Sequence, residues 1–82
     1  MDKDIKKGRL RPGRYQHYKG KFYEAVGIAR HSETLEELVV YKALYSSEFG
    51  FNALWARPMK MFLEKVNHEG RRVPRFKFIS KQ

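Results

Sequence analysis

The chain has 82 residues, enough for one domain, and 41% of them are hydrophobic, which argues against a wholly disordered protein. It has no cysteine, which excludes disulfides, thiolate metal sites and cysteine nucleophiles. The net charge of +9 is uneven: residues 1–21 carry eight cations and two acids, residues 70–82 carry five cations and no acid, and residues 22–69 carry five cations and seven acids.

The N-terminus is basic, but no apolar stretch follows it as in a secretory signal. The longest apolar run, over residues 38–45, contains Lys42 and is far shorter than the ~20 residues that a membrane helix needs. We therefore expect a cytoplasmic monomer without membrane contact.

Residues 1–13 are predicted to form a flexible basic arm, and residues 14–82 a single small domain. Met1–Pro12 is polar, and its only large apolar side chains are Ile5 and Leu10, too few to pack reliably. The Pro12-Gly13 pair marks the boundary.

Two strands are predicted next, over residues 14–18 and 22–30. Both show alternation, and the Lys19-Gly20 pair between them suits a tight hairpin turn, because glycine adopts positive φ without steric cost. The large side chains of the second strand share one face, which we expect to point into the core: Phe22, Val26 and Ile28.

Residues 38–45 are apolar on both faces, which is typical of a central strand. We assign Leu38, Val40 and Leu44 to the core face, which leaves Tyr41 and Tyr45 on the opposite face. Residues 31–37, which lead into this strand, are expected to form a structured loop with about one helical turn.

The last third of the chain contains a loop over residues 46–52, a short strand over residues 53–57 and a helix that begins at Pro58. Helical spacing predicts a stripe of Met59, Phe62, Leu63 and Val66, with Gly70 after the helix end. A final strand over residues 73–79 places Phe76 and Phe78 on one face and Arg75 and Lys77 on the other. The fold class is mainly β: a small SH3-like barrel or a strongly bent antiparallel sheet of about five strands, with one short helix.

Several stretches of the chain match one known pattern, namely residues 18–23, 29–34, 37–41, 43–45, 54–58 and 61–62. Together they resemble the bacterial domain-of-unknown-function family numbered sixteen fifty-three, over about Arg14 to Phe78. The resemblance implies a compact bacterial domain. It assigns no activity, ligand or catalytic residue, and it leaves the N-terminal arm outside the family.

The first functional hypothesis is a binding module for a small ligand or peptide. It combines a polar loop with an aromatic face expected on the outside of a barrel. Its candidate residues are Arg30, His31, Ser32, Glu33, Thr34, Tyr41, Tyr45, Trp55 and Arg57. The alternative is structural: the loop bonds to itself, Arg30 pairs with a glutamate and the aromatics pack as core. Self-contained bonding at His31 and Glu33, with Tyr41 buried under the helix, would remove the site.

The second hypothesis is a nucleic-acid-associated module that uses the basic termini, because clustered cations neutralise phosphates. Its candidate residues are Lys6, Lys7, Arg9, Arg11, Arg14, Arg71, Arg72, Arg75 and Lys77. The alternative is that these charges only keep the protein soluble.

Catalysis has little support in the sequence. A hydrolase that used His31 would need Ser32 within reach, but neighbouring residues on an extended chain point to opposite faces, and no Gly-x-Ser-x-Gly elbow is present. His17, His31 and His68 share no metal-ligand spacing, and the glycines form no phosphate loop. We assign no catalytic residue, metal or cofactor and expect a protein that is not an enzyme.

Overall fold

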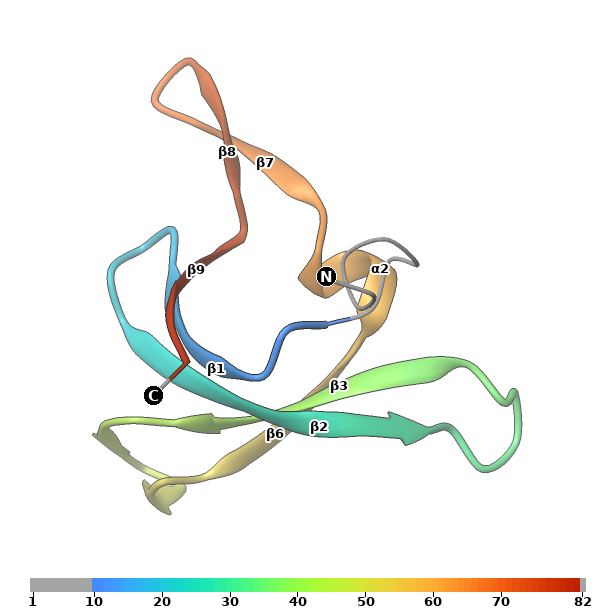
Figure 1. Ribbon diagram of the computed structural model, residues 1–82. Helices are drawn as coiled ribbons and strands as arrows, with labels where there is room; N and C mark the ends of the chain where they lie inside the picture. Colours follow the sequence, from blue (N-terminus) through green and yellow to red (C-terminus); the bar gives the residue numbers. More distant parts are fainter. Residues whose placement is uncertain (1–9, 82) are drawn as a thin grey trace.

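The structure is a computed structural model that describes residues 10–81, and most of this part of the chain is β-strand (Figure 1). The elements in chain order are β1 (Gly13–His17), β2 (Phe22–Arg30), β3 (Glu37–Ala43), β4 (Ser46–Ser47), β5 (Gly50–Phe51), β6 (Leu54–Pro58), α2 (Met59–Phe62), β7 (Lys65–His68), β8 (Arg71–Pro74) and β9 (Phe76–Ser80). The mainly β fold class is confirmed, and β2 has the predicted bounds.

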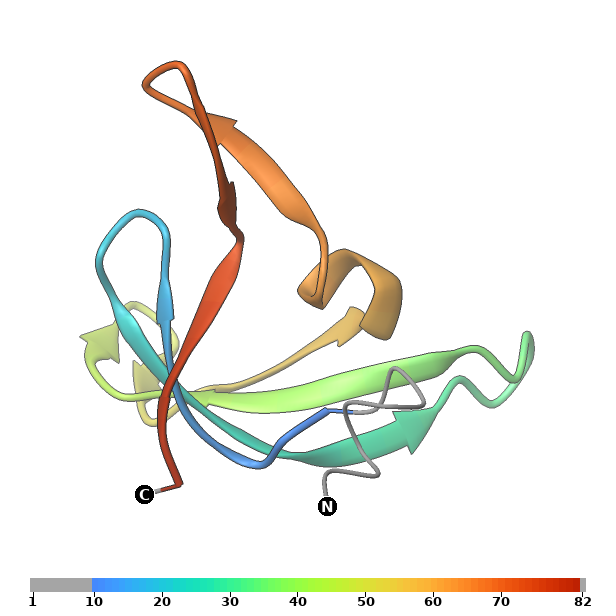
Figure 2. The ribbon, with the colours of Figure 1, turned by 45° about the horizontal axis from the view of Figure 1, so that its top comes forward.

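Five strands form one antiparallel sheet in the order β6-β3-β2-β1-β9. Strand β2 is the middle strand, and β3, which was predicted to be central, lies beside it. The sheet is strongly bent and does not close into a barrel (Figure 2). The β7–β8 hairpin is a separate two-stranded sheet that projects beyond α2 and β9 (Figures 1 and 2). Within residues 10–81, no helix is long and apolar enough to cross a membrane.

A β-bulge at Val26 interrupts the alternation of β2, so that its two halves do not share the predicted core face. Pairing with β3 passes from Ala25 opposite Tyr41 to Gly27 opposite Val40, so one residue of β2 has no partner. Ala25 is buried, whereas Phe22 is exposed and Val26 is 54% exposed. The prediction that Phe22 and Val26 face the core is wrong. Ile28 lies opposite the buried Val39 and so points to the core side, but at its exposed rim.

The core face of β3 is also the opposite of the predicted one. Val39, Tyr41 and Ala43 are buried, whereas Leu38 and Val40 lie on the outer face and are half-buried. The Tyr41 ring lies 5.4 Å from the ring of Phe62, on α2. Tyrosine tolerates such burial when its hydroxyl has a partner, and Arg57 Nε donates to this hydroxyl at 3.2 Å.

Aromatic rings fill the space inside the bent sheet. Phe62 and Phe76 stack with their ring centroids 4.1 Å apart, and Tyr15 and Tyr41 contact this pair. Phe76 is buried, and Phe78, on the same face of the predicted last strand, is partly buried against the core.

Leu10 is buried in this core, and the Tyr15 hydroxyl donates to the backbone oxygen of Arg11 at 2.6 Å. The packed body therefore begins before Arg14, and the expectation that Leu10 would not pack is wrong. The rest of the predicted arm, over residues 1–9, lies outside the described residues.

The predicted helix is much shorter than its apolar stripe. It ends after Phe62, and Val66 pairs with Val73 between β7 and β8. Glu69 and Gly70 both have positive φ, the backbone of a tight two-residue hairpin turn. A β-branched cross-strand pair joined by such a turn favours the hairpin over a longer helix, so Gly70 closes a hairpin and does not follow a helix end.

Candidate functional site

The loop over residues 31–36 satisfies its own polar groups. His31 Nδ1 accepts hydrogen bonds from the backbone N–H groups of Glu33 and Thr34, at 3.1 and 3.3 Å. Thr34 Oγ1 accepts one from the backbone N–H of Glu36 at 3.2 Å. This nitrogen of His31 is therefore engaged in shaping the loop, which agrees with the structural alternative.

Arg30 is held in the same way: it donates to the backbone oxygen of Leu35 at 2.9 Å and pairs with Glu37 at 3.8 Å. Ser32 and Glu33 are exposed on the loop. The loop joins the far ends of β2 and β3, away from the strand ends that lead to β4 and β6 (Figure 1). The structure thus separates the five loop candidates from the aromatic ones.

Tyr41 is buried against Phe62 of α2, so both conditions that remove the combined loop-and-aromatic site are met. The remaining four candidates nevertheless come together apart from the loop, and Tyr23 joins them. They line a cavity of about 270 Å³, which we call the aromatic pocket: Tyr23, Tyr41, Tyr45, Trp55 and Arg57. Strand register explains the grouping, because directly opposed residues point to the same face. Trp55 lies opposite Tyr41, Arg57 opposite Val39, and Tyr23 opposite Ala43. The pocket is therefore on the inner face of the bent sheet, and its predicted place on the outside is wrong.

Hydrogen bonds fix the polar groups of the aromatic pocket. The hydroxyls of Tyr23 and Tyr45 lie 2.6 Å apart, and Arg57 Nε donates to the Tyr41 hydroxyl at 3.2 Å. Trp55 is 40% exposed, so part of its ring is open to a ligand. Hydroxyls held in this way can orient a ligand beside an aromatic surface.

The electrostatics of the aromatic pocket favour an anion. Burial raises the pKa of Tyr23, as does its hydrogen bond with Tyr45, so the Tyr23 hydroxyl is neutral at pH 7. No carboxylate among residues 10–81 pairs with Arg57, and Lys21 Nζ lies 4.7 Å from the centroid of the Tyr45 ring. The described side chains of the pocket thus combine neutral acceptors with positive charge.

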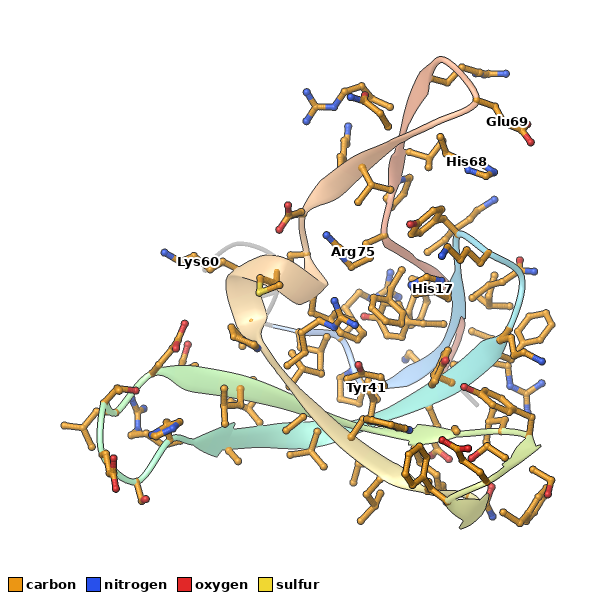
Figure 3. The ribbon with its side chains drawn as sticks, turned by 180° about the vertical axis from the view of Figure 1, so that it is seen from behind. His17, Tyr41, Lys60, His68, Glu69 and Arg75 are labelled. Carbon is orange, nitrogen blue, oxygen red and sulfur yellow. The ribbon has the colours of Figure 1, made fainter. Side chains whose placement is uncertain are left out.

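A second cavity, of about 360 Å³, lies between the β1–β2 turn and the β7–β8 hairpin. We call it the hairpin pocket, and it is lined by Gln16, His17, Tyr18, His68, Val73, Pro74 and Lys77. The His17 and Tyr18 rings have centroids 4.6 Å apart, and Tyr18 and His68 are 5.3 Å apart. In Figure 3, His68, His17 and Tyr41 follow one another from this hairpin down to the sheet. Of these lining residues, only Lys77 was predicted from the sequence.

His17 sits at the junction of the two pockets, because its ring centroid is also 6.3 Å from that of Tyr23. Burial lowers the pKa of His17, and the positive charges of Arg57, Arg75 and Lys19 lower it further. Its Nδ1 accepts the backbone N–H of Lys19 at 3.2 Å, so the described contacts hold a neutral ring.

The cations predicted to form a basic surface lie on different elements and have different contacts. Arg75 is mostly buried, donates to the backbone oxygen of Met61 at 3.1 Å and pairs with Glu64 at 3.6 Å, so it holds structure together (Figure 3). The Arg11 guanidinium lies 3.8 Å from the centroid of the Phe78 ring.

The other described candidates are exposed on different elements: Arg14 on β1, Arg71 and Arg72 on β8, and Lys77 on β9. Lys6, Lys7 and Arg9 lie outside the described residues.

A strongly bent five-stranded sheet with two aromatic pockets defines a small, mainly β domain. The chain belongs to the family described as "Protein of unknown function (DUF1653)", whose model matches residues 13–78. It is similar to the crystal structure of a DUF1653 protein from Bordetella bronchiseptica, with 40% sequence identity and a TM-score of 0.78 over 85% of this chain and 87% of that one. No curated protein matches the chain.

Proposed function

We propose that the protein is a small binding module whose aromatic pocket holds a planar ligand with an anionic group, a carboxylate or a phosphate. The module acts by binding, as a cytoplasmic monomer. The loop over residues 31–36 is left out of the site, because His31 and Arg30 are bonded within it.

The observation that carries the proposal is Arg57. Arg57 is half-buried, its Nε donates to the Tyr41 hydroxyl, and its guanidinium carbon lies 5.7 Å from the centroid of the Phe76 ring. Among the described side chains, these two contacts leave its terminal N–H groups without a hydrogen-bond acceptor. A desolvated arginine usually has an anionic partner, because its terminal N–H groups match a carboxylate or phosphate. Since no described carboxylate takes this place, a ligand anion fits it.

The aromatic rings supply the second half of the recognition. Trp55 presents part of its ring, and Phe49 supports it edge-on with the centroids 5.4 Å apart. The Tyr23–Tyr45 hydroxyl pair fixes the wall beside it. A planar ligand stacked on Trp55 therefore has apolar contact on its face and hydroxyls and a cation at its edge.

The chain has one tryptophan, so intrinsic fluorescence reports on this pocket directly. We expect adenosine monophosphate to quench Trp55 saturably, and adenosine, which lacks the phosphate, to bind at least tenfold more weakly. Arg57→Gln should remove this preference, because the guanidinium no longer faces the phosphate.

The matched control is Arg72→Gln, which removes an exposed arginine from β8. It should bind adenosine monophosphate like the unmodified chain. Equal binding of the nucleotide by Arg57→Gln and by the unmodified chain would refute the proposal, as would equal affinity for nucleotide and nucleoside.

A further inference from the structure

Aromatic rings connect the two pockets without a break. Centroid distances are 5.5 Å from Tyr45 to Tyr23, 6.3 Å from Tyr23 to His17, 4.6 Å from His17 to Tyr18 and 5.3 Å from Tyr18 to His68. We call these five residues the aromatic ladder. Each is half-buried, so each is held by the fold and still presents part of its surface.

We propose that the aromatic ladder binds single-stranded nucleic acid, with one base in the aromatic pocket, another in the hairpin pocket and the backbone running between them. This inference rests on the proposed function of the aromatic pocket and names its ligand class. Proteins that bind single strands combine stacking rings with cations that follow the backbone, at site sizes of about four nucleotides and more. A ladder with rings from β1, β2, β7 and two connecting segments provides several stacking positions.

Cations occur along the whole ladder. Lys21 Nζ lies 4.7 Å from the Tyr45 ring centroid and Lys19 Nζ lies 5.8 Å from that of Tyr18, while Arg57 lines one pocket and Lys77 the other. The described ladder residues contact one carboxylate, that of Glu69, which lies 3.8 Å from His68 Nε2 and is highly exposed. The charge beside the rings is therefore suited to phosphates.

The shape of the site favours a single strand over a duplex. The ladder lies along the inner face of a bent sheet and between two hairpins, in cavities of about 270 and 360 Å³. Bases of a duplex are stacked on one another and cannot enter such cavities, whereas bases of a single strand can be splayed out onto aromatic side chains. A peptide would gain little from a row of lysines and an arginine unless it were acidic.

The test is fluorescence anisotropy of the full chain with fluorescein-labelled oligothymidylates of two and eight nucleotides, and with the matching oligouridylates. We expect the octamer to bind at least tenfold more tightly than the dimer, because it reaches both pockets. Tyr18→Leu should weaken octamer binding about tenfold, the size expected for one lost stacking position, and should change dimer binding less than twofold. Lys77→Gln should weaken the octamer severalfold by loss of a phosphate contact.

Two variants serve as matched controls. Phe51→Leu removes a highly exposed aromatic ring from β5, and Lys60→Gln removes an exposed lysine from α2, both outside the two pockets. Both should bind the octamer within twofold of the unmodified chain.

Three results would overturn the inference. The first is octamer binding that is unchanged in both Tyr18→Leu and Lys77→Gln, or equally reduced in the controls. The second is the absence of any octamer binding. In both cases the nucleotide titration with Arg57→Gln still decides the aromatic pocket separately. The third is octamer binding that is weakened by Tyr18→Leu but not by Arg57→Gln, which would refute the ladder as one site and leave the proposed function to the nucleotide titration.

Discussion

At the scale of single residues, several side chains on the inner face of the sheet combine an apolar ring with a polar hydroxyl group. Tyr41 is buried because Arg57 supplies a donor to its hydroxyl, and Tyr23 is held because Tyr45 shares a hydrogen bond with it. These polar atoms cost little to bury when paired, and among residues 10–81 no buried side-chain polar atom lacks a partner. The same pairs that stabilise the core therefore also shape the aromatic pocket.

His17 makes the stability of the fold dependent on pH. Burial and the charges of Arg57 and Arg75 lower its pKa in the folded protein, whereas an unfolded histidine titrates near 6.5. Above about pH 6.5 the histidine is neutral in both states, and its contribution to the free energy of unfolding is complete. Below about pH 6.5 the unfolded state binds more protons than the folded state, so the free energy of unfolding decreases as the pH falls toward the pKa of the folded protein.

Urea denaturation at pH 7.5 and pH 5.5 measures this effect. We expect His17→Gln to lose less stability than the unmodified chain between the two values, because its side chain does not titrate. Equal losses in both proteins would show that His17 does not contribute to the pH dependence.

At the scale of elements, local patterns in the sequence predicted where strands lie better than which way they face. The alternation over residues 22–30 located β2, but the bulge at Val26 leaves no mark in that alternation and moves Phe22 to the outside. In β3 both faces are apolar, so the sequence offered no means to choose Tyr41 over Val40 for the core. The buried Tyr41 hydroxyl accepts a hydrogen bond from Arg57 on the next strand, a tertiary contact that no local pattern shows.

The candidate site was likewise only partly predictable from the sequence. Tyr41, Tyr45, Trp55 and Arg57 were found from their residue types and strand positions. The hairpin pocket was missed because His17, Tyr18 and His68 come from two hairpins far apart in the sequence. The β7–β8 hairpin was not predicted, because Val66 fits the helical spacing that starts at Met59 although it lies in β7.

The β7–β8 turn gives a direct test of why the hairpin forms. Glu69 has a φ of 52°, a conformation that asparagine adopts more readily, and Asn-Gly is a preferred pair for such turns. We expect Glu69→Asn to raise the free energy of unfolding by about 0.5 kcal/mol, and Glu69→Val to lower it by about 1 kcal/mol, because a β-branched residue is strained at positive φ. Chemical denaturation checks both values, and a variant order opposite to this one would contradict the turn assignment.

At the scale of the whole molecule, the fold separates charges that the sequence places together. Pairing of β1 with β9 brings the two ends of the described chain side by side. However, Arg75 forms a salt bridge with Glu64, and the Arg11 guanidinium packs on the ring of Phe78. Of the cations beside the ladder, Lys19, Lys21 and Lys77 belong to the basic ends of the sequence and Arg57 belongs to its middle. Among the predicted nucleic-acid candidates, only Lys77 lines one of the two pockets. The charge of the two ends thus located some of the cations beside the rings, but it did not single out Arg57 or exclude Arg75 and Arg11.

This division predicts how binding responds to salt. Replacing Lys6, Lys7 and Arg9 with glutamine in the full chain should reduce the slope of log K against log salt for the octamer by about 0.7 for each phosphate contact that the arm makes. The order of affinities among Tyr18→Leu, Phe51→Leu and the unmodified chain should stay the same, because stacking depends on rings and not on ionic strength. If the triple variant lost binding at every salt concentration, the basic terminus would be the binding element and the ladder would have no part in it. Anisotropy titrations between 50 and 300 mM salt therefore separate general attraction to phosphates from recognition by the aromatic pockets.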